Sequence, residues 1–224
     1  MRRAAIDSRH SVFNKLLAHY RLDEPSGQAL DSSGNGYHSA VVSGATQGDT
    51  NAHKRTSYDF DGIDDYVQIT ASGLITALAG KSVFAMAGWF SSDVFEEIGS
   101  ALSIGDNGSN DVCGMYPYRL IGGVDKVSGW YNNQRIIEFN APYAADNSQH
   151  FHVFNHESAT SHKYYVDNVL EATSTDNKTL SASTDQVMLG AYSPGVEHHN
   201  GTDDEIMIFG DSLTADEMTY LSNI

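Results

Sequence analysis

Oxygen-bearing side chains alternate along one short stretch near the start of the chain. Asp31, Ser33 and Asn35 occupy every second position, and Gly36 follows them. This spacing suits a hard cation such as Ca²⁺, because carboxylate, hydroxyl and amide oxygens can surround the ion while glycine takes the sharp turn. An EF-hand would need a bidentate glutamate at the twelfth loop position, which here is Val42. The stretch is therefore either an ordinary turn or half of a site completed by a distant carboxylate.

The elements that must position this loop are short strands. Apolar and polar residues alternate in short runs, separated by clusters of Gly, Asn, Asp and Ser that are typical of turns. Thr214 and Glu217 form a capping-box pattern, which predicts one helix from 215 to about 222. Because no βαβ alternation occurs, we predict an all-β, two-sheet antiparallel sandwich. The expected strands are 16–22, 38–42, 57–60, 66–69, 82–90, 100–104, 126–131, 134–139, 150–155, 162–166, 169–174, 186–191 and 204–209.

The composition limits the classes of partner. A chain of 224 residues that is 40% hydrophobic can bury one sizeable core, and no apolar run is long enough to predict a membrane span. The single cysteine, Cys113, excludes an intrachain disulfide framework and a multi-cysteine zinc site. The net charge of −16 argues against nucleic acid and anionic membranes as partners. It suits divalent cations and neutral polar ligands, and it is equally typical of a simple solubility feature.

The N-terminal residues differ from the rest. Residues 1–15 show no sustained period and are expected to form an arm or short helix outside a single domain, 16–224. Residues 1–16 carry four basic residues and one acidic residue, and the first ten lack the apolar core of a secretory signal. We expect the arm to pack on a neighbouring subunit or a larger assembly.

Six segments, taken together, resemble the laminin-G-like, concanavalin A-like lectin/glucanase family. In the family's order they are 17–24, 31–36, 58–67, 87–90, 163–168 and 201–209. The resemblance implies a jelly-roll sandwich. It also implies that the aspartate of the closing strand, Asp204, lies next to the loop that begins at Asp31. The chain departs from the family pattern in 150–153 and in the extra carboxylate, Asp203.

This implied pairing would complete a structural Ca²⁺ site. Side chains of Asp31 and Asn35, carbonyl groups of 33–37, Asp204 and water would reach the six to eight oxygens that calcium takes. Strand alternation places Asp204 on the same face as Ile206 and Ile208, where a buried carboxylate needs a cationic partner. The alternative is an Asx turn at Asp31, with Asp204 hydrogen-bonded to loop amides.

Candidate ligand-binding residues lie in the middle of the chain. Sugar sites combine aromatic faces with amides and carboxylates. The residues of this kind are Tyr116, Tyr118, Trp130, Tyr131, Asn132 and Asn133. Packing within the core is the alternative role for the aromatic members. The Glu-x-Asp-x-x-Glu pattern of the glucanase branch is absent, so we expect no catalytic residues and no enzymatic activity.

These features together predict a non-catalytic, calcium-stabilised lectin-like module. It would bind carbohydrate or a cell-surface glycan, with a role in adhesion, outside the cell or on a virion surface. The alternative is a structural subunit of a larger assembly, such as a bacteriophage virion decoration or fibre protein, tethered through residues 1–15. A glycoside hydrolase is the third hypothesis.

Overall fold

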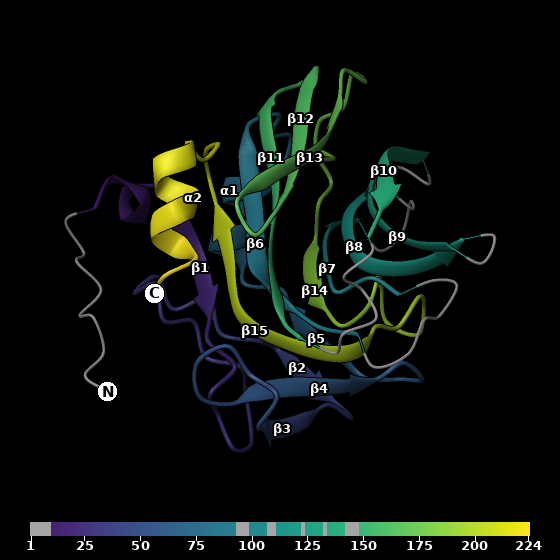
Figure 1. Cartoon of the computed structure of the whole chain (residues 1–224). Helices are drawn as coiled ribbons and strands as arrows, with labels where there is room; N and C mark the ends of the chain where they lie inside the picture. Colours follow the sequence, from purple (N-terminus) through teal and green to yellow (C-terminus); the bar gives the residue numbers. More distant parts are fainter. Residues whose placement is uncertain (1–9, 93–98, 107–110, 122–123, 132–133, 142–147) are drawn as a thin grey trace.

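Two antiparallel β-sheets face each other in the computed structural model of this chain (Figure 1). The structure describes residues 10–92, 99–106, 111–121, 124–131, 134–141 and 148–224. The larger sheet has eight strands in the order β13-β12-β11-β6-β15-β4-β3, with β1 also paired to β15. The smaller sheet has seven, in the order β10-β9-β8-β7-β14-β5-β2. The predicted two-sheet sandwich is thus confirmed.

The elements follow one another along the chain with only two short α-helices and one 3-10 helix among the described residues. Their bounds are η1 (Ser11–Asn14), β1 (Leu16–Tyr20), β2 (Val41–Ser43), β3 (Thr46–Asp49), β4 (Ser57–Asp61), β5 (Tyr66–Ile69), α1 (Ser72–Leu78), β6 (Phe84–Phe90), β7 (Leu102–Asp106), β8 (Asp111–Ile121), β9 (Val124–Tyr131), β10 (Gln134–Asn140), β11 (His150–Ser158), β12 (Ser161–Val166), β13 (Val169–Ser174), β14 (Gln186–Leu189), β15 (Asn200–Phe209) and α2 (Ala215–Leu221). None of these helices is long and apolar enough to span a bilayer.

The last strand, β15, organises the larger sheet. Its first four residues pair with β4, and its residues 206–209 pair with β1 along the same edge. On the opposite edge, residues 203–209 pair with β6. Strands from the beginning and the end of the chain are therefore held in one hydrogen-bonded layer.

The main core lies between the sheets and is rich in aromatic residues, including Tyr20, Tyr58, Phe60 and Phe90. A second apolar cluster covers the outer face of the larger sheet, where α2 packs over β15 and β11. The predicted capping box of α2 is present, since Thr214 and Glu217 exchange side-chain-to-backbone hydrogen bonds. One broad face of the smaller sheet is left without a helix among the described residues.

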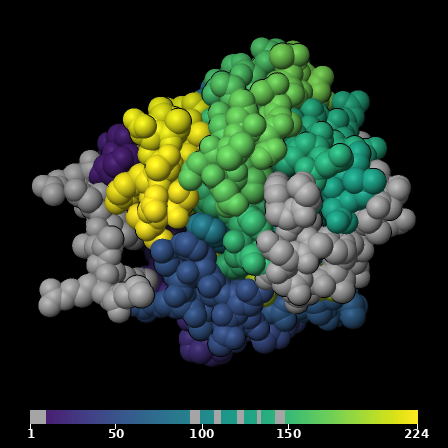
Figure 2. Space-filling view, in the orientation of Figure 1, coloured from purple at the N-terminus to yellow at the C-terminus, as the bar shows by residue number. Residues whose placement is uncertain are grey.

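The segment 10–15 packs against α2, beside which it lies in Figure 2. His10 stacks on Tyr220 with ring centroids 4.1 Å apart, and the Lys15 ammonium contacts the Glu217 carboxylate at 2.7 Å. Residues 1–9 of the predicted arm lie outside the described part of the chain, so its docking to a partner stays a prediction.

Most expected strands are present within a few residues of their predicted bounds, but β3, β8 and α1 were not predicted. β8 is the longest strand of the protein. Gly114 and Pro117 within it are typical of loops, which hides the strand in the sequence. The structure accommodates Pro117 where the pairing with β9 shifts register, between Tyr116 and Arg119.

Candidate functional site

The outer face of the smaller sheet carries a cluster of aromatic and charged side chains, of which Tyr116 is buried and Trp130 half-buried. Alternation along β9 sends Val127 and Tyr131 into the core and leaves Trp130 on the opposite, outer face. Across the ladder, Trp130 faces Gly114 of β8 and Arg135 of β10. We call the following residues the outer-face cluster: Tyr116, Arg119, Lys126, Trp130, Arg135, Glu138 and, from the loop before β15, Glu197.

Two aromatic rings and two guanidinium groups form the centre of this cluster. The rings of Tyr116 and Trp130 lie 5.6 Å apart at an angle of 47°. The Arg119 guanidinium carbon lies 4.7 Å from the centroid of Trp130 and 5.8 Å from that of Tyr116. Arg135 lies 5.7 Å from Trp130. These distances are within the range of cation–π attraction.

Hydrogen bonds fix the surrounding polar groups. Glu138 accepts from Lys126 at 2.6 Å and also from Arg135, while the Tyr116 hydroxyl donates to Glu197. Burial opposes ionisation of Glu138, but these two cationic donors outweigh it and hold its pKa below the usual range. Burial also lowers the pKa of Arg119, and the nearby Arg135 charge acts in the same direction.

Of the predicted ligand-binding residues, Tyr116 and Trp130 come together in this cluster, Tyr116 as a buried side chain and Trp130 as a half-buried one, and two others do not. Tyr118 is buried and donates its hydroxyl to the Phe90 carbonyl at 3.1 Å. Tyr131 is buried beside the His156 ring. Both face the interior, so we correct their placement. The remaining two candidates, Asn132 and Asn133, lie outside the described residues.

The register explains why Tyr118 turns inward. Tyr116 is opposite Ser128, whereas Arg119, three residues later, is opposite Lys126, only two residues away on β9. The extra residue in β8 is a β-bulge, which reverses the face of the following side chains. It turns Arg119 outward, to Trp130. The sequence prediction missed Arg119 because it contained no strand at β8, and strict alternation along β8 would also have turned this residue inward. It could have found Arg135, because the predicted hairpin already places that residue opposite Trp130.

The predicted metal loop at Asp31 is closed by its own hydrogen bonds. The buried Asp31 carboxylate accepts from the backbone amides of His19, Ser33 and Tyr37 at 2.8–3.0 Å and from the Ser33 hydroxyl at 2.9 Å. Burial works against ionisation, yet these donors hold the pKa of Asp31 below its usual value. The Asn35 amide donates to the Leu17 carbonyl at 2.9 Å. This geometry matches the alternative interpretation, an Asx turn.

The other predicted metal ligands of this loop, Ser33 and Gly36, also have local structural roles. The Ser33 hydroxyl donates to the Leu17 carbonyl as well as to Asp31, and Gly36 has a φ of 76°, which suits its predicted turn role. Because the two oxygens of the Asp31 carboxylate already accept hydrogen bonds from four donors, Asp31 fits poorly as a calcium ligand. Calcium binding at this loop has no support from the geometry and stays a prediction.

Asp204 lies on a different face from the one that alternation predicts. It is opposite Trp89, which packs on the outer side of the larger sheet, whereas Asp203 is opposite the core residue Phe90. The cause is a β-bulge, because Glu205 has a φ of 50° and the pairing with β6 shifts after Asp204. Ile206 therefore continues the face of Asp203.

The surroundings of Asp204 are rich in ionisable groups. Its Oδ2 accepts from the Lys54 amide at 3.0 Å, and its buried Oδ1 has no hydrogen-bond donor among the described residues. Burial raises the pKa of Asp204 to about 7, and the Glu205 charge adds to this effect. Glu205 itself contacts the His19 ring at 2.5 Å. Asp204 and Asp31 have separate sets of partners, and the structure gives no contact between them.

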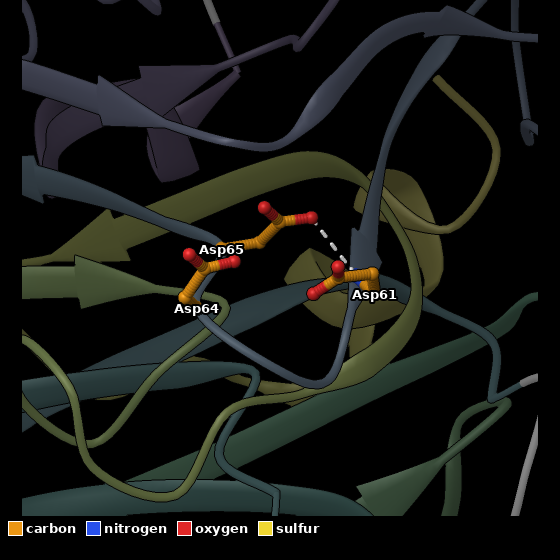
Figure 3. A group of neighbouring side chains, drawn as sticks. All are labelled: Asp61, Asp64 and Asp65. Atoms are coloured by element: carbon orange, nitrogen blue, oxygen red, sulfur yellow. Dashed lines mark hydrogen bonds between the residues drawn. The ribbon is translucent and has the colours of Figure 1, made fainter.

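Within the described ranges, one group of three carboxylates meets the distance requirement of a metal site. Asp61 ends β4, and Asp64 and Asp65 lie in the turn before β5; the ligand atoms of the three carboxylates are within 4.8 Å of one another (Figure 3). The Asp65 carboxylate accepts from the Asp61 amide at 2.9 Å, as the dashed line shows. Two of the three side chains are exposed, and the group is closed by local hydrogen bonds, so we assign no ion to it.

Comparison with known proteins places this fold in a family. A sequence profile of the concanavalin A-like lectin/glucanases superfamily matches residues 60–219. The chain belongs to this superfamily. The β-bulges of β8 and β15 both lie within the matched region of this superfamily member. The sequence matches no curated protein at a significant level.

Several solved structures are similar in fold. Domain 4 of AbnA, a GH43 extracellular arabinanase from Geobacillus stearothermophilus in complex with arabinotriose, is 17% identical, with a TM-score of 0.70 over 93% of this chain and 98% of that chain. The Ruminococcus gnavus IT-sialidase CBM40 bound to α2,3-sialyllactose is 17% identical, with a TM-score of 0.58 over 74% and 96%.

A third similar structure comes from a longer protein. The botulinum neurotoxin serotype D binding domain is 13% identical, with a TM-score of 0.67 over 95% of this chain. This chain spans 52% of that one. At these identities the similarity concerns the fold, so the function must be argued from the residues of this chain.

Proposed function

We propose that this protein is a non-catalytic carbohydrate-binding module whose ligand site is the outer-face cluster. The observation that carries the proposal is the half-buried Trp130, which packs beside the buried Tyr116 and is ringed by arginine, lysine and glutamate side chains on the outer face of the smaller sheet. Saccharides present apolar C–H faces and many hydroxyl groups, and such a mixture of rings and charged donors and acceptors matches both.

The comparisons support this proposal at the level of the fold. Two of the similar structures are described with a bound saccharide, arabinotriose in one and α2,3-sialyllactose in the other. Both are domains or modules of larger glycan-cleaving proteins, which is the setting in which a binding domain acts without catalysing cleavage.

Within the outer-face cluster, the state of the Glu138 carboxylate supports a role in binding rather than catalysis. A retaining or inverting glycosidase needs one carboxylic acid with a raised pKa and one carboxylate near it. Glu138 is bonded to two cations, which hold its pKa low. Glu197 accepts a hydrogen bond from Tyr116. In the described part of the cluster, Glu138 is thus ill suited to act as the proton donor.

The two tryptophans of the chain allow a direct test, because Trp89 lies on the other sheet. The Trp89→Phe variant leaves Trp130 as the sole tryptophan, and Trp130→Phe does the reverse. A saccharide found on a glycan array, with arabinotriose and 3′-sialyllactose as first probes, should change the fluorescence of Trp89→Phe and leave that of Trp130→Phe unchanged. Trp130→Ala should weaken binding at least about tenfold, the equivalent of 1.4 kcal/mol.

Two outcomes would contradict the proposal. One is the absence of binding to every saccharide on the glycan array by protein that melts cooperatively and is therefore folded. The other is saccharide binding that Trp130→Ala leaves intact, because the ligand would then occupy another surface. Release of reducing sugar from any bound glycan would instead support the hydrolase alternative.

A further inference from the structure

Positive charge is concentrated on the outer face of β8, β9 and β10 in a protein that is otherwise acidic. The chain has 13 Lys and Arg residues against 29 Asp and Glu residues. From these three strands the outer-face cluster takes Arg119, Lys126, Arg135 and one carboxylate, Glu138, whereas Asp111 and Asp125 of the same strands are outside the cluster. An acidic protein that gathers three cations at one aromatic site creates a local field opposite to its overall charge.

The two arginines share one aromatic ring. Arg119 lies 4.7 Å and Arg135 5.7 Å from the Trp130 centroid, so two positive groups are held close to each other from the strands on either side of β9. Like charges repel at such separations, and part of this repulsion remains even at an exposed surface. An anion placed beside both guanidinium groups would relieve it.

Two carboxylates provide the counter-charges that the described cluster itself contains. Glu138 serves Lys126 and Arg135 together, and Glu197 receives the Tyr116 hydroxyl. The Arg135 side chain remains 41% exposed, which leaves some of its five N–H donors facing solvent. The described cluster thus carries three positive charges against two negative ones, and its exposed member is a guanidinium.

We propose that the outer-face cluster selects saccharides that bear a carboxylate, such as a uronic or sialic acid. This inference rests on the proposed carbohydrate-binding function and names its substrate class. The planar guanidinium of Arg135 matches a carboxylate in a bidentate geometry, and Arg119 adds a second positive charge beside the same ring. The apolar side of the sugar contacts the half-buried ring of Trp130.

The overall charge predicts how this selectivity depends on salt. A charge of −16 repels an acidic saccharide at long range, but at physiological ionic strength that repulsion is screened beyond about 8 Å. The local attraction of the cations then decides binding. Affinity for an acidic saccharide should fall as salt rises further, whereas affinity for a neutral saccharide should hardly change.

The test uses three probes with a common core, namely lactose, a sulfated lactose and 3′-sialyllactose, together with an oligogalacturonate and its neutral galactose counterpart. Binding is measured by calorimetry on the full chain. We expect each carboxylated probe to bind at least about tenfold more tightly than its neutral counterpart, and the sulfated probe to bind less tightly than the carboxylated one. Arg119→Gln and Arg135→Gln should each remove most of the preference.

Matched variants keep this result interpretable. Arg55→Gln removes an exposed arginine elsewhere and should leave the preference intact. Arg135→Lys keeps the charge but loses the planar fork, so it should retain part of the preference, and melting curves confirm that each variant is folded. Equal binding of neutral and carboxylated probes, or a preference for sulfate, overturns this inference. If the preference is absent but Trp130→Ala abolishes binding of neutral saccharides, only the inference about carboxylated saccharides fails and the proposed function survives. If no saccharide binds, both the inference and the proposed function fail.

Discussion

Replacing Asp204 with asparagine should stabilise the protein at alkaline pH when divalent cations are removed. Burial, with help from the Glu205 charge, raises the pKa of Asp204 from 3.8 to about 7. The folded protein therefore keeps a proton that the unfolded chain releases above pH 3.8. The free energy of unfolding falls as pH rises from about 4 to about 7 and is then constant as far as this group is concerned.

The size of this effect follows from the two pKa values. They differ by about 3, and each factor of ten in proton affinity is worth about 1.4 kcal/mol, so ionisation of Asp204 costs roughly 4 kcal/mol at pH 8. Asparagine keeps an acceptor for the Lys54 amide, which donates to Oδ2 at 3.0 Å, and it carries no charge. We expect Asp204→Asn to exceed the wild type by about 2–4 kcal/mol at pH 8 and to equal it near pH 4.

The measurement is urea unfolding followed by circular dichroism between pH 4 and pH 8, with chelator present throughout. Glu171→Gln is the control, because it removes a carboxylate from an exposed position on β13. The reasoning is wrong if Asp204→Asn is no more stable than the wild type at pH 8 in chelator, or if its pH dependence is unchanged.

The same variants test the calcium prediction. If calcium binds beside Asp204, calcium will raise the melting temperature of the wild type at pH 8, and Asp204→Asn will lose this response. If calcium changes neither protein, the cation prediction fails, and Asp204 is ionised at pH 8 without a bound cation.

The remaining predictions concern stability, measured by urea unfolding at neutral pH. Asp31→Ala should cost about 3 kcal/mol or more with or without calcium, because three backbone amides lose their acceptor. Gly190→Ala should cost at least about 3 kcal/mol, because the φ of Gly190 is 73° and an added Cβ would lie 2.2 Å from the Phe60 ring. Gly195→Ala should cost only about 1 kcal/mol, because Gly195 has a similar φ of 78° but no atom lies near the added Cβ. Thr214→Ala should cost about 1 kcal/mol by removing the cap of α2, and equal losses for the two glycine variants would contradict the steric argument.

The sequence predicts the fold well where hydrophobic periodicity and turn chemistry agree. The turn at Asp167 and Asn168 is an example: both residues have the positive φ expected of a tight hairpin, at 48° and 67°. The helix cap at Thr214 is another. Both signals are local, so no knowledge of the rest of the chain is needed to interpret them.

The side-chain faces were harder to predict, because strict alternation fails at a bulge. One extra residue near Tyr118 turns that side chain inward and Arg119 outward. The bulge at Glu205 exchanges the faces expected for Asp203 and Asp204. Bulges depend on pairing with a partner strand, and the sequence of one strand alone does not contain that information.

The pairing of β1 with β15 also constrains how the molecule folds. The partner strand of residues 16–20 in the larger sheet is formed by residues 206–209, so this pairing spans most of the chain. Closing so long a loop costs conformational entropy before the hydrogen bonds and contacts of the pairing can offset it. Such long-range pairing is typical of slow-folding β-proteins. During synthesis, β1 emerges from the ribosome long before β15 exists. Until β15 has been synthesised, β1 has no partner strand in the sheet, and during this interval chaperones can protect it.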